Sequence, residues 1–164
     1  MSAERGRKRT AARLAAVQAL YQMELTGESS RDVIVEFTLH RLKGDIADEG
    51  FGEADRQFFD DLTAGASAHR DDLDRAISAA LTPDWPLARL QAVLRAILRC
   101  GAFELAHRRD VPPQATISEY LDIAHAFFAG KEPGLVNGVL DKLARDIRRE
   151  EMEEPRRGVE PAAR

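Results

Sequence analysis

Apolar side chains recur at steps of three and four residues along most of this chain, which is the spacing of one face of an α-helix. The first run has four such positions: Leu14, Val17, Tyr21 and Leu25. Gly27 follows this run and predicts its end. No segment of useful length alternates apolar and polar residues, as a half-buried strand would. The pattern therefore predicts an all-α fold.

Five more helices are expected after the first one. The periodic segments run from Ser29 or Ser30 to Leu42, from Glu53 to about Leu81 with a bend near Gly65, from Leu87 to Arg108, from Thr116 or Ser118 to about Ala129, and from Leu135 to Arg149. Serine and threonine cap helix starts, whereas glycine and proline interrupt helices. Connections are therefore expected at Lys43–Gly52, Thr82–Pro86 and Val111–Gln114. The total is six helices, or seven if the bend is a break.

The two ends of the chain differ from the region between them. We expect residues 1–13 to form a basic arm leading into the first helix, and residues 7–149 to form the helical domain. Residues 150–164 are charged, contain Pro155 and Pro161, and lack an apolar period. This tail is predicted to be disordered, because it offers too little apolar surface to bury.

Composition limits the class of protein. The chain has 164 residues, about one domain, and its 44% of hydrophobic residues suffices for a core. The longest stretch without a charged side chain is Leu14–Met23, which is too short to cross a bilayer. Cys100 is the single cysteine, which excludes an internal disulfide. We therefore expect a cytoplasmic protein with no membrane partner.

Charge is distributed unevenly. The net charge is −4, but the first 13 residues contain five basic side chains and one acidic side chain. Residues 14–144 contain 13 basic and 21 acidic side chains, so the body of the chain is acidic. Any attraction for phosphate is therefore local to the N-terminal segment. Short basic runs are also common at solvated helix ends, so charge alone leaves both interpretations open.

No catalytic or cofactor-binding pattern emerges. The four histidines include no pair at the i, i+4 spacing of a helical zinc site: His40, His69, His107 and His125. Cys100 lies beside the apolar positions of its helix, where a buried and inert thiol is expected. The glycine-containing segment 130–138 lacks the consecutive lysine and serine or threonine of a phosphate-binding loop. We expect no cofactor, no metal and no enzymatic activity.

Three segments carry a family resemblance. They are Arg13-Leu-Ala-Ala-Val-Gln-Ala-Leu-Tyr21 with the arginines before it, Ala96-Ile-Leu-Arg-Cys-Gly-Ala-Phe-Glu-Leu105 with Asp110-Val-Pro112, and Ile117-Ser-Glu119 with Leu135-Val-Asn-Gly-Val-Leu-Asp-Lys142. In this order they resemble the NusB family of transcription antitermination factors, from about Arg7 to Ile147.

The resemblance implies an all-α, NusB-like helical bundle of two small subdomains. It also implies that the chain binds boxA-type RNA together with NusE, a small-subunit ribosomal protein. That complex joins RNA polymerase on ribosomal RNA operons. Monomer and homodimer both remain open. A helical protein–protein adaptor without direct RNA readout is the alternative, in which the acidic body docks a basic partner.

Candidate RNA-binding residues come from the N-terminal segment and from the matched motifs: Arg5, Arg7, Lys8, Arg9, Arg13, Tyr21, Lys131 and Leu135. Arginines and lysines on a mobile arm can follow an RNA backbone. Tyr21 fits two interpretations, a core position with its hydroxyl at the edge or a platform for stacking on a base. The structure has to decide between them.

Several positions depart from the family pattern. Leu94 replaces a usual acidic residue, and Ser118 replaces an asparagine. Leu135 replaces a phenylalanine, which weakens any base stacking there. Lys131 stands where relatives often carry an acidic residue, and a lysine favours phosphate instead.

Three further residues in the matched segments suggest packing or pairing. Gly138 lies inside a predicted helix, where we interpret it as allowing a close helix–helix approach. Asp141 and Arg145 are spaced for an i, i+4 ion pair. Arg99 is a candidate partner in a structural ion pair, and the role of Asn137 stays open.

Overall fold

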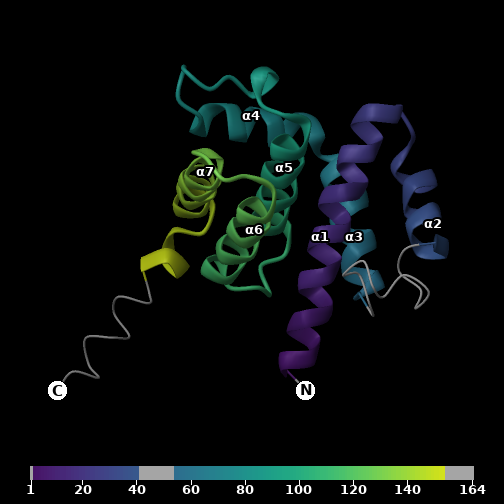
Figure 1. The fold of residues 1–164 in the computed structure, drawn as a ribbon. Helices are drawn as coiled ribbons and strands as arrows, with labels where there is room; N and C mark the ends of the chain where they lie inside the picture. Colours follow the sequence, from purple (N-terminus) through teal and green to yellow (C-terminus); the bar gives the residue numbers. More distant parts are fainter. Residues whose placement is uncertain (1, 41–53, 154–164) are drawn as a thin grey trace.

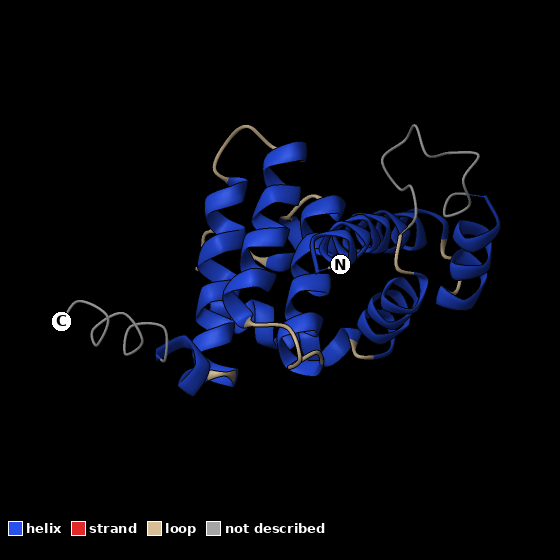
Figure 2. Cartoon of the chain, turned by 90° about the horizontal axis from the view of Figure 1, so that it is seen from below, coloured by secondary structure: helices blue, strands red, loops and turns tan. Residues whose placement is uncertain are grey.

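The computed structural model describes residues 2–40 and 54–153, and every regular element in these ranges is helical (Figures 1 and 2). The elements are α1 (Ser2–Thr26), α2 (Ser30–His40), α3 (Arg56–Ala68), α4 (Arg70–Ala80), the short 3₁₀ helix η2 (Leu87–Arg89), α5 (Ala92–His107), α6 (Pro113–Phe127) and α7 (Glu132–Ile147). The predicted all-α fold class is confirmed. None of these helices is long and apolar enough to cross a bilayer.

Two groups of helices meet along α1 and α5. Helices α1, α2 and α3 pack against one another, while α4, α6 and α7 pack around α5. Figure 1 shows the first group on one side of the molecule and the second group on the other. The extensive contact between α1 and α5 joins the two groups. These groups correspond to the two small subdomains that the resemblance implies.

Small residues allow the central helices to approach closely. Four alanines on the inner face of α1 are fully buried: Ala12, Ala15, Ala16 and Ala19. In α5, a Cβ atom at Gly101 would stand 2.8 Å from Cδ1 of Leu140 on α7. Because interiors are close-packed, any side chain at Gly101 would displace its neighbours.

The basic N-terminal segment is helical and does not form an arm ahead of the first helix. Helix α1 begins at Ser2, so all five basic residues expected in the arm lie on it. Arginine, lysine and alanine are strong helix formers. The backbone N–H of Asp55 also donates to the carbonyl of Lys8 at 3.1 Å, which ties this part of α1 to the start of α3. The expectation of a mobile arm is corrected accordingly.

The long helix expected from Glu53 to Leu81 is two helices that meet at His69. Gly65, where we expected a bend, lies inside α3. A Cβ atom there would stand 2.1 Å from the ring of Phe103 on α5. The glycine therefore makes room for a ring from another helix, which the pattern along one segment does not reveal.

Other helix boundaries also differ from those expected from the sequence. Helix α6 begins at Pro113, because proline suits the first turn of a helix, and Thr116 is buried and is not a cap. Helix α7 begins at Glu132, three residues before the expected start. Residues 149–153 are helical and Met152 is buried, so order continues into the segment expected to be a disordered tail. Residues 154–164 and the predicted connection Lys43–Gly52 lie outside the described residues.

The interpretation of Gly138 as a packing residue is wrong. It is exposed, and a Cβ atom there would meet nothing within 4 Å. The predicted pair of Asp141 and Arg145 is confirmed, with Nε donating to the carboxylate at 2.9 Å. Asn137, which precedes Gly138 in the sequence, is also exposed.

Candidate nucleic-acid interface

The basic residues of α1 point to different sides of the helix. Each residue turns an α-helix by about 100°, so neighbours in sequence face different directions. Arg5 and Arg7 are exposed, and neither has an ion pair within the described part of the chain. Lys8 is half-buried and lies 3.6 Å from Glu4. Arg9 and Arg13 face inward and are held by carboxylates.

Arg13 lies in a buried polar cluster between α1, α5 and α6. Its side chain is only 4% exposed, and its Nε and Nη2 donate to Glu104 at 2.9 and 2.7 Å. The fully buried Glu104 also accepts from Thr116 and Tyr120, each at 3.0 Å. Burial and the charge of Glu104 raise the pKa of Tyr120, which keeps its hydroxyl a donor. Every lone-pair direction of this buried carboxylate therefore has a partner.

Glu119 extends the Arg13 cluster to the surface. Nη1 of Arg13 donates to Oε1 of Glu119 at 2.9 Å, and the hydroxyl of Thr10 lies 2.5 Å from the same oxygen. The Arg13 side chain thus connects three helices. The prediction that Arg13 contacts RNA does not fit this position, because such contact would leave a buried carboxylate without its counter-charge.

Arg9 belongs to a second charged cluster around the ring of Phe58. Its guanidinium lies 4.6 Å from the ring centroid and is paired with Asp55 at 3.7 Å and Asp110 at 3.6 Å. Arg108 lies 4.8 Å from the same ring and donates to Asp110 at 3.0 Å. This hydrogen bond lowers the pKa of Asp110 to about 2. Arg9 therefore anchors α1 to α3 and to the turn after α5.

The exposed face of α1 changes character along its length. Helical spacing places Arg7, Leu14, Gln18, Tyr21 and Leu25 within one stripe. The stripe is basic at the N-terminal end and apolar at the other. Tyr21 is 39% exposed, so the interpretation of it as a core residue is wrong.

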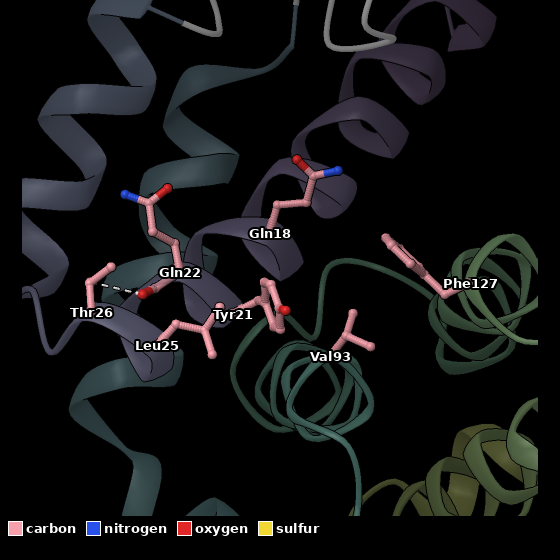
Figure 3. A pocket seen from close by; sticks show the side chains of 7 residues that line it. All are labelled: Gln18, Tyr21, Gln22, Leu25, Thr26, Val93 and Phe127. Atoms are coloured by element: carbon pink, nitrogen blue, oxygen red, sulfur yellow. Dashed lines mark hydrogen bonds between the residues drawn. The ribbon is translucent and has the colours of Figure 1, made fainter.

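An apolar groove of about 510 Å³ lies at the C-terminal end of this stripe. It is lined by Gln18, Tyr21, Gln22, Leu25 and Thr26 of α1, Val93 of α5 and Phe127 of α6. In Figure 3, Tyr21 and Leu25 lie on one side of the groove, while Val93 and Phe127 project from the facing helices. Leu25 and Phe127 are 63% and 43% exposed, which is unusual for large apolar side chains.

Lys131 and Leu135 form a separate part of the predicted site. Lys131 is exposed at the start of α7, and Leu135 is half-buried against the core one turn further on. Figure 1 shows α7 on the far side of α6 from α1. The structure therefore divides the predicted RNA-binding residues into an α1 group and an α7 group.

Sequence reasoning missed the groove because it combines three helices. Val93 and Phe127 belong to two different predicted helices, and only the assembled fold shows that both line a groove with α1. It also missed a histidine stack, in which the rings of His69 and His107 lie 4.5 Å apart although they are 38 positions apart in sequence. Local spacing gives no signal for either feature.

Two residues of α5 have structural positions that fit the sequence analysis. Arg99 donates to Asp74 at 2.7 and 3.0 Å and lies 3.4 Å from Glu24, which confirms the structural ion pair. Cys100 is fully buried, and burial raises the pKa of its thiol, so the reactive thiolate is disfavoured. Among the described residues, no group of three or more potential metal ligands comes together.

Comparisons with known proteins agree with the resemblance seen in the sequence. The model of the NusB family matches residues 10–145. The chain is 46% identical over 148 residues to the transcription antitermination protein NusB of Rhodopseudomonas palustris (strain BisB18), covering 90% of this chain and 88% of that protein. It is 48% identical over 145 residues to the protein of the same name from Bradyrhizobium sp. (strain BTAi1), covering 88% and 86%.

Solved structures share the fold. T. maritima NusB superimposes with a TM-score of 0.70 at 28% identity, covering 88% of this chain and 96% of that one. A crystal structure of the antitermination factors NusB and NusE in complex with double-stranded RNA gives the same TM-score at 25% identity, covering 85% and 98%.

Proposed function

The chain belongs to the NusB family, and on this premise we propose that it is an RNA-binding antitermination factor that engages boxA-type RNA together with the ribosomal protein NusE. One observation carries the proposal: a single exposed face of α1 has free arginine at one end and an open apolar groove at the other. Such a face can hold a nucleic acid and a protein side by side. The RNA polymerase complex on ribosomal RNA operons is the proposed setting, and the role is one of binding without catalysis.

The N-terminal end of α1 is the proposed phosphate-binding part. Arg5 and Arg7 are exposed, and Lys8 follows Arg7 directly in the sequence. Arginine and lysine bind nucleic-acid backbones by neutralising phosphates and releasing counterions. Arg9 and Arg13 support this surface indirectly, because their ion pairs hold α1 against α3, α5 and α6. Lys131 and Leu135 are retained as a second proposed contact.

The apolar groove is the proposed site for the protein partner. Tyr21, Leu25 and Phe127 expose apolar surface that water solvates poorly, and burial against a partner would release that water. A NusB relative with the same fold has been solved with NusE and RNA. A basic ribosomal protein would also offset the acidic charge of residues 14–144.

Partner and RNA are expected to bind cooperatively. The acidic body repels phosphate, so RNA binding by the chain alone should be weak. A partner that covers acidic surface should strengthen it, and linkage then requires RNA to strengthen partner binding by the same factor. A coupling of roughly 1–3 kcal/mol is typical for such cooperation.

A titration tests this proposal. RNA affinity is measured for boxA-containing and scrambled RNA, with and without saturating NusE, and NusE affinity with and without RNA. Leu25→Glu should weaken NusE binding, whereas Val35→Glu should not, because Val35 is a similarly exposed apolar residue on α2 and does not line the groove. NusE binding without any RNA affinity would favour the adaptor alternative. Ultracentrifugation of the free chain separates monomer from homodimer.

A further inference from the structure

Glu119 presents one carboxylate oxygen to solvent while the other is fixed in place. Oε1 receives the hydrogen bond from Nη1 of Arg13 at 2.9 Å and the contact from Thr10 at 2.5 Å. The Thr10 hydroxyl has a single hydrogen, and a carboxylate attracts it more strongly than the carbonyl of Gly6 at 2.9 Å. Within the described part of the chain, Oε2 accepts no hydrogen bond.

The position of Glu119 is unusual for an exposed carboxylate. Its side chain is 24% exposed, whereas the Arg13 side chain that holds it is 4% exposed. Most surface carboxylates rotate freely, but this one is fixed to a buried guanidinium that is itself locked by Glu104. A hydrogen-bonding group that is already ordered loses little entropy when it binds a ligand.

Glu119 also lies beside the proposed phosphate-binding part of α1. Thr10 follows Arg7 by three residues, so the two side chains are neighbours on the helix surface. An RNA phosphate at Arg7 would bring its nucleotide next to the Thr10–Glu119 contact. Single-stranded RNA is recognised through the hydrogen-bonding edges of unstacked bases.

We propose that Oε2 of Glu119 is a fixed hydrogen-bond acceptor that reads the exocyclic amino group of a cytosine or adenine in the bound RNA. This inference rests on the proposed RNA-binding function and adds a specificity residue to it. On the edge that faces the major groove in a duplex, cytosine and adenine present an amino donor, whereas uracil and guanine present a carbonyl oxygen. An acceptor facing a carbonyl oxygen gains no hydrogen bond and repels it. At one nucleotide position, the protein should therefore bind the amino bases cytosine and adenine more tightly than the keto bases uracil and guanine.

The substitution Glu119→Gln gives the sharpest test. Arg13 and Thr10 both donate, so they fix the amide oxygen in the place of Oε1 and leave the amide NH₂ in the place of Oε2. A donor then stands where the acceptor stood. The substitution should reverse the base preference instead of only weakening binding.

The experiment uses the full chain with saturating NusE and a set of single-stranded boxA-type RNAs in which each position is changed in turn. At one position the wild-type chain should prefer amino to keto bases by about tenfold, the value of one hydrogen bond to a charged group. Glu119→Gln should reverse that preference, and Glu119→Ala should abolish it. Asp122→Asn is the matched control, because it removes one exposed carboxylate from the same helix and should leave the preference unchanged.

The outcomes are distinguishable. This inference would be overturned if the wild-type chain, Glu119→Gln and Glu119→Ala all bound RNA with the same base preference. The proposed function would then remain intact. Equal weakening on every RNA would also overturn it, because Glu119 would then act only by holding Arg13. No RNA binding by the wild-type chain with NusE would overturn the proposed function itself. Thermal unfolding of each free variant shows whether the fold is retained.

Discussion

The guanidinium of Arg13 and the carboxylate of Glu104 meet inside the fold through two hydrogen bonds, at 2.9 and 2.7 Å. They join α1 to α5, the two helices along which the subdomains meet. The hydroxyls of Thr116 and Tyr120 complete the coordination of the carboxylate from α6. The arginine that sequence analysis assigned to an RNA surface is therefore part of the core.

Removal of the Arg13 guanidinium should destabilise the fold severely. We expect Arg13→Ala to lower the free energy of unfolding by roughly 3–5 kcal/mol, because Glu104 would remain as a buried charge without a partner. Urea denaturation monitored by circular dichroism measures this change. Arg7→Ala is the control and should unfold like the wild-type chain. Equal midpoints for the two variants would show that the buried pair contributes no net stability.

The exposed arginines should affect RNA binding without affecting the fold. Replacement of Arg5 and Arg7 by alanine should weaken RNA binding and flatten its salt dependence. For single-stranded RNA, each lost phosphate contact should reduce the logarithmic salt slope by roughly 0.7. Fluorescence anisotropy at several salt concentrations measures the slope, and the melting temperature should stay unchanged. An unaltered slope would place the phosphate contacts elsewhere, with Lys131 as the next candidate.

The residues that share one face of a helix were predictable, because their spacing in the sequence determines the face on which each side chain lies. Most helices of the described residues and many of their core positions follow from that spacing, whereas the helical N-terminal segment and the break at His69 do not. Arg7 and Arg13, in contrast, belong to the same basic run, and nothing local separates an exposed arginine from a buried one. The difference comes from Glu104, 91 positions away, which the fold brings against Arg13.

The same limit explains why the roles of Gly65 and Gly138 were predicted wrongly. Gly138 lies within one of the three segments that resemble the NusB family but faces open space, whereas Gly65 and Gly101 accommodate Phe103 and Leu140 from other helices. Sequence analysis can detect a glycine inside a predicted helix. It cannot identify the side chain that packs against this glycine, because that side chain comes from another helix. The apolar groove was missed for the same reason, because α1, α5 and α6 each contribute only part of it.

Alanine substitutions at these glycines should therefore have opposite effects. Gly138→Ala should raise the free energy of unfolding by roughly 0.5–1 kcal/mol, because alanine is the better helix former and space is free. Gly65→Ala should lower it by roughly 1–3 kcal/mol, because the added Cβ would displace the buried ring of Phe103. Chemical denaturation of the two variants side by side checks the signs. Stabilisation by Gly65→Ala would mean that the α3–α5 contact is looser than the structure shows.

Stability should fall in mild acid because of the histidine stack between α5 and the α3–α4 junction. The ring of His107 lies 4.5 Å from that of His69 and 4.8 Å from that of Phe103. Burial lowers the pKa of His107, as do the nearby His69 and Arg109, while Asp61 acts in the opposite direction. The unfolded chain therefore binds a proton at this site more readily than the folded chain.

The sign of the effect follows from proton linkage. A group whose pKa is lower in the folded state contributes stability that is fully present above its unfolded pKa, about 6.5, and is lost as the pH falls through the folded value. Urea midpoints of the wild-type chain should decline from about pH 7 to pH 5, and His107→Gln should flatten that decline. His125→Gln, which changes an exposed histidine outside the stack, is the control and should retain the wild-type slope. Identical pH profiles for His107→Gln and the wild-type chain would show that this stack does not couple folding to protonation.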